Sequence, residues 1–197
     1  LARGLARQGC GGLEWAGGIP GTVGGAVVYN AGAYGGCLAD VLRSVTVVDG
    51  EGQEEVIAAG DLDLSYRGSA FVRGLLAERV VLWAEFGLRP GSAEELTARV
   101  RELDARRLAD QPRGRNAGSI FKNTPEYPAW QLIDQVGLRG YRIGDAQVSP
   151  KHANFFINAG RARASEVKAL IELALGRVRE RFGLELELEI ALVGEGF

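Results

Sequence analysis

A serine, a lysine and an asparagine follow one another closely in residues 116–123, which have the sequence NAGSIFKN. The glycine before Ser119 has no side chain, so a bound molecule can approach the backbone closely there. The Ser119 hydroxyl, the Lys122 ammonium and the Asn123 amide would place a proton donor, an anion contact and a hydrogen-bonding pair together. The same run is also typical of a structural turn that leads into a short strand.

A glycine-rich stretch over residues 17–36 forms a second candidate site. Apolar residues are interleaved with its glycines, so we expect ordered backbone and not a flexible linker. The stretch matches neither the Rossmann fingerprint nor the P-loop. It is either a purely structural turn or a backbone cradle for a phosphate-bearing cofactor. Residues 20–22 suit a helix start beneath such a phosphate, and Asn30 and Tyr34 could contact a planar ring.

Arg67 is the third candidate, within residues 64–69 (LSYRGS). The planar fork of a guanidinium group suits a carboxylate or a developing enolate. A surface turn is the alternative interpretation of this segment.

Glu189 is the fourth candidate, in a predicted strand over residues 184–193. Glutamates and leucines alternate there, so the glutamates share one face of the strand. The alternation stops after Glu189, because Ala191 and Val193 continue the same face as apolar residues. We therefore expect Glu189 at the border of the core, where a carboxylate is a better functional candidate than on a solvated face.

Two further features have a structural and a functional interpretation. The six arginines between residues 99 and 115 form either an ordinary solvated helix surface or a local basic surface for a diphosphate or nucleotide phosphate. His152 has no carboxylate beside it in the sequence to orient its ring, so we expect it to be structural and not catalytic.

The composition excludes several classes of protein. A net charge of -2 argues against a broad nucleic-acid-binding face, and no apolar run reaches the roughly 20 residues that a membrane span needs. One histidine and the two cysteines, Cys10 and Cys37, provide neither a metal site nor a secreted disulfide framework. We expect a cytoplasmic protein without metal. The chain begins with Leu and contains no Met, which is typical of a piece of a longer protein.

The pattern of elements predicts the α+β class, because strands and helices are mixed without strict βαβ alternation. The predicted strands cover residues 41–48, 53–57, 79–88, 154–158 and 184–193. The predicted helices cover residues 93–108, 130–136 and 165–182, and residues 109–118 are predicted to be a loop. Ser92 is the expected N-cap of the first helix, with Glu95 as its capping-box partner.

Six motifs follow one another along the chain: residues 18–26 (GIPGTVGGA), 30–35 (NAGAYG), 66–69 (YRGS), 117–121 (AGSIF), 132–144 (LIDQVGLRGYRIG) and 189–194 (EIALVG). In this order and spacing they resemble the UDP-N-acetylenolpyruvoylglucosamine reductase (MurB) family, in its shorter subtype. The family's first flavin-binding subdomain, with its glycine-rich phosphate loop, has no counterpart here. The resemblance therefore implies a chain that lacks the first FAD-binding subdomain.

The resemblance also implies a fold and a reaction. Residues 1–108, completed by a last strand over 185–197, would be the C-terminal part of a flavin-binding domain, and residues 109–184 a smaller α+β substrate domain. The implied reaction is NADPH-dependent, FAD-mediated reduction of UDP-N-acetylglucosamine enolpyruvate to UDP-N-acetylmuramate, in peptidoglycan precursor synthesis. The implied protein is a monomer that binds a UDP-sugar, without nucleic acid or membrane insertion.

The resemblance assigns roles to residues as well. Arg67 and Glu189 would stabilise the substrate carboxylate, Glu189 as a protonated hydrogen-bond donor, and Ser119 would donate the proton. Lys122, Asn123 and Arg107 would hold the substrate. The FAD-binding residues would be Gly18, Ile19, Pro20, Gly21, Thr22, Gly24, Gly25, Asn30 and Tyr34. The alternatives are an unrelated flavoprotein oxidase, or a nucleotide-sugar-binding fragment that is inactive without the missing N-terminal subdomain.

Overall fold

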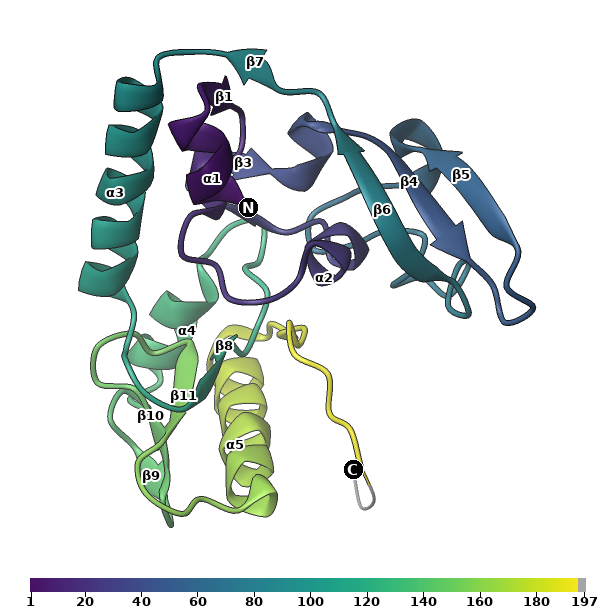
Figure 1. Ribbon diagram of the computed structural model, residues 1–197. Helices are drawn as coiled ribbons and strands as arrows, with labels where there is room; N and C mark the ends of the chain where they lie inside the picture. Colours follow the sequence, from purple (N-terminus) through teal and green to yellow (C-terminus); the bar gives the residue numbers. More distant parts are fainter. Residues whose placement is uncertain (195–197) are drawn as a thin grey trace. The chain divides into compact units, whose positions relative to one another are not determined.

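The computed structural model of the chain describes residues 1–194. It divides into two compact units, Leu1–Arg107 (unit 1) and the residues from Leu108 onward (unit 2). Figure 1 shows the elements of both units, coloured along the sequence. Each unit combines helices with antiparallel strands, so the predicted α+β class is confirmed. Within residues 1–194, no helix is both long enough and apolar enough to cross a membrane.

Unit 1 is built from short elements around one three-stranded sheet. Its helical elements are α1 (Ala2–Arg7), η1 (Glu14–Ala16), α2 (Val23–Val28), η2 (Leu38–Asp40), η3 (Ala59–Leu62) and α3 (Ala93–Asp110), the last of which extends into unit 2. Its strands are β1 (Cys10–Gly11), β2 (Gly32–Ala33), β3 (Gly36–Cys37), β4 (Leu42–Val48), β5 (Glu54–Ala58), β6 (Val80–Phe86) and β7 (Arg89–Pro90). β1 pairs with β7, β2 pairs with β3, and the main sheet has the order β5-β4-β6.

The main sheet of unit 1 forms where the sequence predicts strands. β4 is its central strand, and Val45 and Val47 of β4 are buried on its inner face. The β4–β5 turn is closed by Asp49, whose Oδ1 accepts hydrogen bonds from the backbone N–H groups of Glu51 (2.9 Å) and Gln53 (2.8 Å). In Figure 1, β4 lies between β5 and β6.

The core of unit 1 joins this sheet to the glycine-rich stretch. Val27 of α2 is fully buried, and Trp15 of η1 belongs to the same apolar cluster as the inner face of β4. α2 also packs directly against β6 (Figure 1). The interleaved apolar residues therefore give the glycine-rich stretch a fixed backbone, as the sequence predicts.

Unit 2 is one antiparallel sheet with two helices. Its elements after α3 are β8 (Asn116–Ser119), α4 (Ala129–Gln135), β9 (Arg142–Ile143), β10 (Ala146–Val148), β11 (Phe155–Asn158) and α5 (Ala164–Phe182). The strand order is β8-β11-β10-β9. The predicted apolar stripe of α5 is buried at Leu170, Ile171, Ala174 and Val178 and packs against β9 and β10. Gly183, with φ of 67°, ends α5 in the left-handed conformation.

The prediction of a strand over residues 184–193 is wrong. That segment contains only an isolated antiparallel bridge, between Leu188 and Phe121. Its apolar side chains, Leu186 among them, pack into the core of unit 2. The alternation of leucine and glutamate therefore reflects one-sided burial and not a continuous ladder. The family resemblance assigns residues 185–197 to the first lobe. In the structure the described residues of this segment belong to unit 2, and residues 195–197 lie outside the described part.

Two smaller differences concern the ends of elements. Ser92 caps α3 as predicted, because its Oγ accepts a hydrogen bond from the backbone N–H of Glu95 at 3.3 Å. α3 continues to Asp110, slightly beyond its predicted end. β8 covers Asn116–Ser119, most of which the sequence predicted to be loop. The small residues of this segment lack the β-branched side chains that are typical of a strand. The segment is a strand because it pairs with β11.

Candidate functional site

In unit 1, the start of α2 is organised around Thr22. Thr22 is the N-cap of the helix, and its Oγ1 accepts a hydrogen bond from the backbone N–H of Gly25 at 3.0 Å. This bond fixes the turn that the sequence predicted as a helix start.

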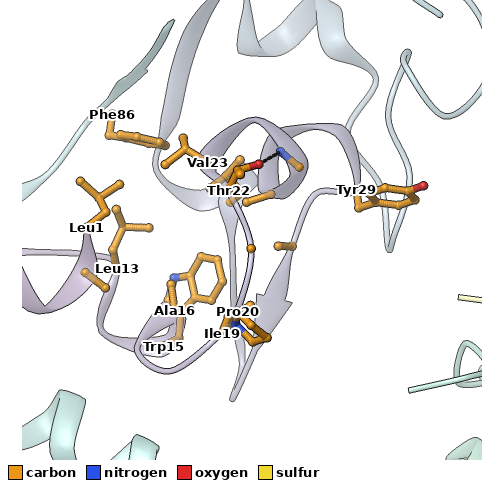
Figure 2. A pocket seen from close by; sticks show the side chains of 16 residues that line it. Leu1, Leu13, Trp15, Ala16, Ile19, Pro20, Thr22, Val23, Tyr29 and Phe86 are labelled. Carbon is orange, nitrogen blue, oxygen red and sulfur yellow. Dashed lines mark hydrogen bonds between the residues drawn. The ribbon is translucent and has the colours of Figure 1, made fainter. Parts of the chain in front are cut away.

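A cavity of about 410 Å³ lies beside this turn (Figure 2). Its walls are mostly apolar and come from α1, η1, the turn before α2 and the end of β6. Of the predicted FAD-binding residues, Ile19, Pro20, Gly21, Thr22 and Gly25 line it. The other four, Gly18, Gly24, Asn30 and Tyr34, are not among its lining residues. A mostly apolar cavity with a few polar groups is typical of a cofactor or small-molecule site.

Gly18 and Tyr34 instead contact the side of α3. Gly18 has φ of +78°, and a Cβ there would lie 2.3 Å from Oδ1 of Asp104. The ring of Tyr34 lies under two guanidinium groups, at 5.2 Å from Cζ of Arg106 and 5.5 Å from Cζ of Arg107. The predicted substrate residue Arg107 therefore lies beside the glycine-rich stretch, in a cation–π contact.

Asn30 connects the glycine-rich stretch to the segment that carries Arg67. Asn30 is only 5% exposed, and its Nδ2 donates to the carbonyl of Ser65 at 2.8 Å. Its Oδ1 accepts from the backbone N–H of Ala39 at 3.0 Å. Ser69 is fully buried, and its hydroxyl donates to the carbonyl of Val28 at 2.5 Å. These bonds give Asn30 a structural role that the sequence did not predict.

Arg67 lies at the tip of this anchored turn, with φ of 51°. The left-handed conformation costs a residue with a side chain about 1 kcal/mol or more, so the surrounding bonds must impose it. The Nη2 of Arg67 donates to the carbonyl of Gly32 at 2.9 Å, and its Cζ lies 5.2 Å from the ring centre of Tyr66. Backbone strain of this kind is common where a side chain must be aimed at a ligand.

In unit 2, Ser119 is the last residue of β8 and pairs with Phe155 of β11. The next ladder pair joins Asn116 to Ile157, so β8 has one extra residue and the register shifts. Gly118 has φ of +84° within this bulge. A bulge bends its strand and redirects the side chain beside it, which is common next to active sites.

Glu189 lies on the segment next to Ser119. The backbone N–H of Glu189 donates to the carbonyl of Ile120 at 2.8 Å, and the N–H of Lys122 donates to the carbonyl of Glu187 at 2.8 Å. The structure thus brings Ser119 and Glu189, which are far apart in the sequence, onto neighbouring segments of unit 2.

The two predicted substrate residues behind Ser119 already have partners in the fold. Lys122 forms an ion pair with Glu187, whose side chain is 72% exposed. Oδ1 of Asn123 accepts a hydrogen bond from the N–H of Ala129 at the start of α4, at 3.0 Å. Arg67 and Arg107 belong to unit 1, whereas Ser119, Lys122, Asn123 and Glu189 belong to unit 2.

His152 is half-buried among aromatic rings. Its ring centre lies 4.9 Å from that of Phe155 and 6.3 Å from that of Trp130. Its Nδ1 accepts a hydrogen bond from the N–H of Asn154 at 3.3 Å. Burial, and then the nearby Arg139 charge, lower the pKa of His152. In residues 1–194, no group of three or more His, Cys, Asp or Glu side chains could hold a metal ion.

Comparison with known proteins places these features in a family. Residues 110–193 match the family model for the UDP-N-acetylenolpyruvoylglucosamine reductase C-terminal domain, and residues 1–57 match that for an FAD binding domain. The chain is 45% identical to the UDP-N-acetylenolpyruvoylglucosamine reductase of Synechococcus elongatus, over 99% of this chain and 64% of that protein. It is also 45% identical to reductase 2 of Symbiobacterium thermophilum, over 98% of this chain and 62% of that protein.

A solved structure agrees with these sequence matches. The crystal structure of UDP-N-acetylenolpyruvylglucosamine reductase (MurB) from Thermus caldophilus superimposes with a TM-score of 0.83 at 39% identity, over 96% of this chain and 67% of that one. The chain therefore has the architecture of proteins that join an FAD-binding domain to a reductase C-terminal domain. It belongs to the UDP-N-acetylenolpyruvoylglucosamine reductase (MurB) family.

The bulge before Ser119 gives a first prediction, on the stability of two glycine variants. Among the described residues, no atom lies within 4 Å of a Cβ built at Gly118 or at Gly176 of α5, but only Gly118 has positive φ. Gly118→Ala should therefore lower the free energy of unfolding by about 1–2 kcal/mol, whereas Gly176→Ala should raise it by about 0.5–1 kcal/mol. Urea unfolding followed by circular dichroism measures both. Equal effects would show that backbone strain does not distinguish the two sites.

His152 gives a second prediction, on pH. Because its pKa is lowered in the folded state, the unfolded chain binds more protons, and stability falls as pH decreases from about 6.5 toward the lowered value. His152→Asn keeps an acceptor near Nδ1 and removes the chain's only histidine. The variant should lose less stability than the wild type between about pH 7.5 and 5.5 in urea unfolding. An equal loss in both proteins would contradict the assignment.

Proposed function

We propose that this chain is the catalytic part of a UDP-N-acetylmuramate dehydrogenase. The reaction is NADPH-dependent, FAD-mediated reduction of UDP-N-acetylglucosamine enolpyruvate to UDP-N-acetylmuramate, for peptidoglycan precursor synthesis. Family membership supports this, although the chain spans only 64% of the length of its Synechococcus elongatus relative. The observation that supports the proposal is the backbone pairing of residues 120–122 with residues 187–189, which puts Ser119 and Glu189 on neighbouring segments of unit 2.

The cavity of unit 1 fits part of a flavin. Its walls are mostly apolar, and Gly21 has φ of +127° with open space where a Cβ would point, so a ligand can reach the backbone there. Residues 19–22 and Gly25 would hold FAD, which supplies the hydride chemistry when bound, with NADPH as the reductant. We accordingly propose unit 1 as the FAD lobe and unit 2 as the substrate lobe.

The remaining steps fall to charged and polar side chains of this chain. Reduction of the enolpyruvyl double bond moves negative charge onto the substrate carboxylate. The guanidinium of Arg67, held at the tip of its turn, would stabilise that charge, and Glu189 would hydrogen-bond to the same group. The Ser119 hydroxyl would donate a proton to the carbon next to the carboxylate.

Two cations are proposed to hold the UDP-sugar. The partner of Lys122, Glu187, is exposed, so a substrate phosphate could replace this ion pair at little cost. Arg107 would contribute a second positive charge, and Asn123 an amide. We also propose that the protein acts as a monomer in the cytoplasm.

Flavin absorbance separates this proposal from a nucleotide-sugar-binding fragment. Protein produced from the full coding sequence should purify with the visible absorbance of oxidised flavin, and NADPH should bleach it. Colourless protein that still binds the UDP-sugar would favour the binding fragment. Rapid reaction of the reduced protein with oxygen, without any need for the enolpyruvyl substrate, would favour an oxidase.

Ser119→Ala should separate the two half-reactions. NADPH should still bleach the flavin at the normal rate, but the enolpyruvyl substrate should restore its colour about 10²–10⁴-fold more slowly, because the proton donor is gone. Stopped-flow absorbance measures both rates. Ser165→Ala, at an exposed serine of α5, is the matched control and should behave as wild type. Normal reoxidation in Ser119→Ala would remove Ser119 from the mechanism.

Arg67→Lys and Glu189→Gln should each slow the same reoxidation. Lysine keeps the charge of Arg67 but loses its planar fork, and glutamine keeps the size of Glu189 but loses its carboxyl group. Glu185→Gln, at an exposed position of the same alternating segment, is the matched control and should leave both half-reactions unchanged. Slowing confined to the NADPH half-reaction would count against both roles.

A further inference from the structure

The side chain of Asn154 forms a closed pair of hydrogen bonds with the backbone of Phe121. The N–H of Phe121 donates to Oδ1 of Asn154 at 2.9 Å, and Nδ2 of Asn154 donates to the carbonyl of Phe121 at 2.8 Å. Asn154 is 3% exposed and Phe121 is fully buried. The amide therefore pairs with Phe121 as the backbone of a neighbouring strand would.

Phe121 needs such a partner because of the way it pairs with Leu188. The hydrogen bonds of this bridge are made by the residues on either side of Phe121. The carbonyl of Ile120 accepts from the N–H of Glu189, and the N–H of Lys122 donates to the carbonyl of Glu187. In an antiparallel pair of this kind, the N–H and carbonyl of the central residue point away from the partner segment. The Phe121 groups would be buried without hydrogen bonds if Asn154 did not take them.

The backbone of Asn154 holds the same segment. Its carbonyl accepts a hydrogen bond from the N–H of Ile120 at 2.8 Å, directly after Ser119. Asn154 thus binds two successive residues that follow Ser119, on the side opposite to residues 187–189. The segment between Ser119 and Lys122 is fixed from both sides.

We propose that Asn154 is a positioning residue, which sets the register of residues 119–122 and so places the Ser119 hydroxyl relative to Glu189. The inference rests on the proposed function of those two residues. An asparagine suits this role because its short amide carries the acceptor and the donor on two separate atoms, which reach the N–H and the carbonyl of Phe121 at once; the single hydroxyl of a serine is too short to span both. A displacement of about 1 Å in a proton donor can cost on the order of 100-fold in rate.

The test compares two asparagines of the same sheet region in the holoenzyme. Asn158, the last residue of β11, also hydrogen-bonds two backbone N–H groups through Oδ1, those of Gly160 and Ala162, at 3.0 Å each. Asn154→Ser should slow flavin reoxidation by the enolpyruvyl substrate about 10- to 100-fold and leave reduction by NADPH unchanged. Asn158→Ser should leave both rates unchanged. Equal rates in the two variants, or equal slowing of both half-reactions by Asn154→Ser, would overturn the proposal.

A double variant separates this inference from the proposed function. If Asn154 acts through Ser119, Asn154→Ser should slow reoxidation much less in a Ser119→Ala background than in the wild type. A normal rate of flavin reoxidation in the Ser119→Ala variant would reject the proposed function. Slow reoxidation in Ser119→Ala together with normal reoxidation in Asn154→Ser would reject only the positioning role of Asn154.

Hydrogen exchange of the wild-type protein keeps the proposal testable if the variants fail to fold. The Phe121 amide should exchange as slowly as the buried amides of α5, because Asn154 covers and binds it. Asn154→Asp is a second variant, which keeps the acceptor for the Phe121 N–H and loses the donor to its carbonyl. Rapid exchange of the Phe121 amide in the folded protein would contradict the proposal.

Discussion

The hydrogen bonds that hold residues 119–122 from both sides are the constraint on which the site of unit 2 depends. Asn154 binds this segment on one side, and the backbone of residues 187–189 binds it on the other. Without the first set, buried polar groups of Phe121 would lack partners. Without the second, the segment that carries Glu189 would not pair with the residues that follow Ser119. The proposed chemistry therefore depends on a backbone frame more than on any one catalytic side chain.

Unit 1 fixes its own candidate residues by a comparable device. Buried Asn30 and Ser69 tie the Arg67 turn to the glycine-rich stretch, and these bonds hold Arg67 in a conformation that an isolated turn would avoid. The same stretch borders the cavity in which we place the flavin. In both units, a buried polar side chain holds an irregular segment beside a residue for which we propose a functional role.

The sequence correctly predicts the elements that local sequence patterns specify, such as the β4–β5 hairpin and helix α5 with its apolar stripe. It fails at residues 184–193, because alternating burial and strand pairing leave the same pattern in a sequence. The sequence also identifies Ser119 and Glu189 as candidate residues, but it does not predict the backbone hydrogen bonds that join their two segments. The role of Asn154 has no local signal, since its partner Phe121 lies 33 residues away and is bound through backbone atoms.

The most direct test of the central claim, that this frame presents Ser119 as the proton donor, is the stereochemistry of a single turnover. The proton donor reaches the substrate carbon from one fixed side, so the wild-type holoenzyme should give the product in one configuration, which nuclear magnetic resonance can determine. Ser119→Ala should form product slowly and as a mixture of configurations. Product formed at the wild-type rate and in the same single configuration by Ser119→Ala would contradict the account.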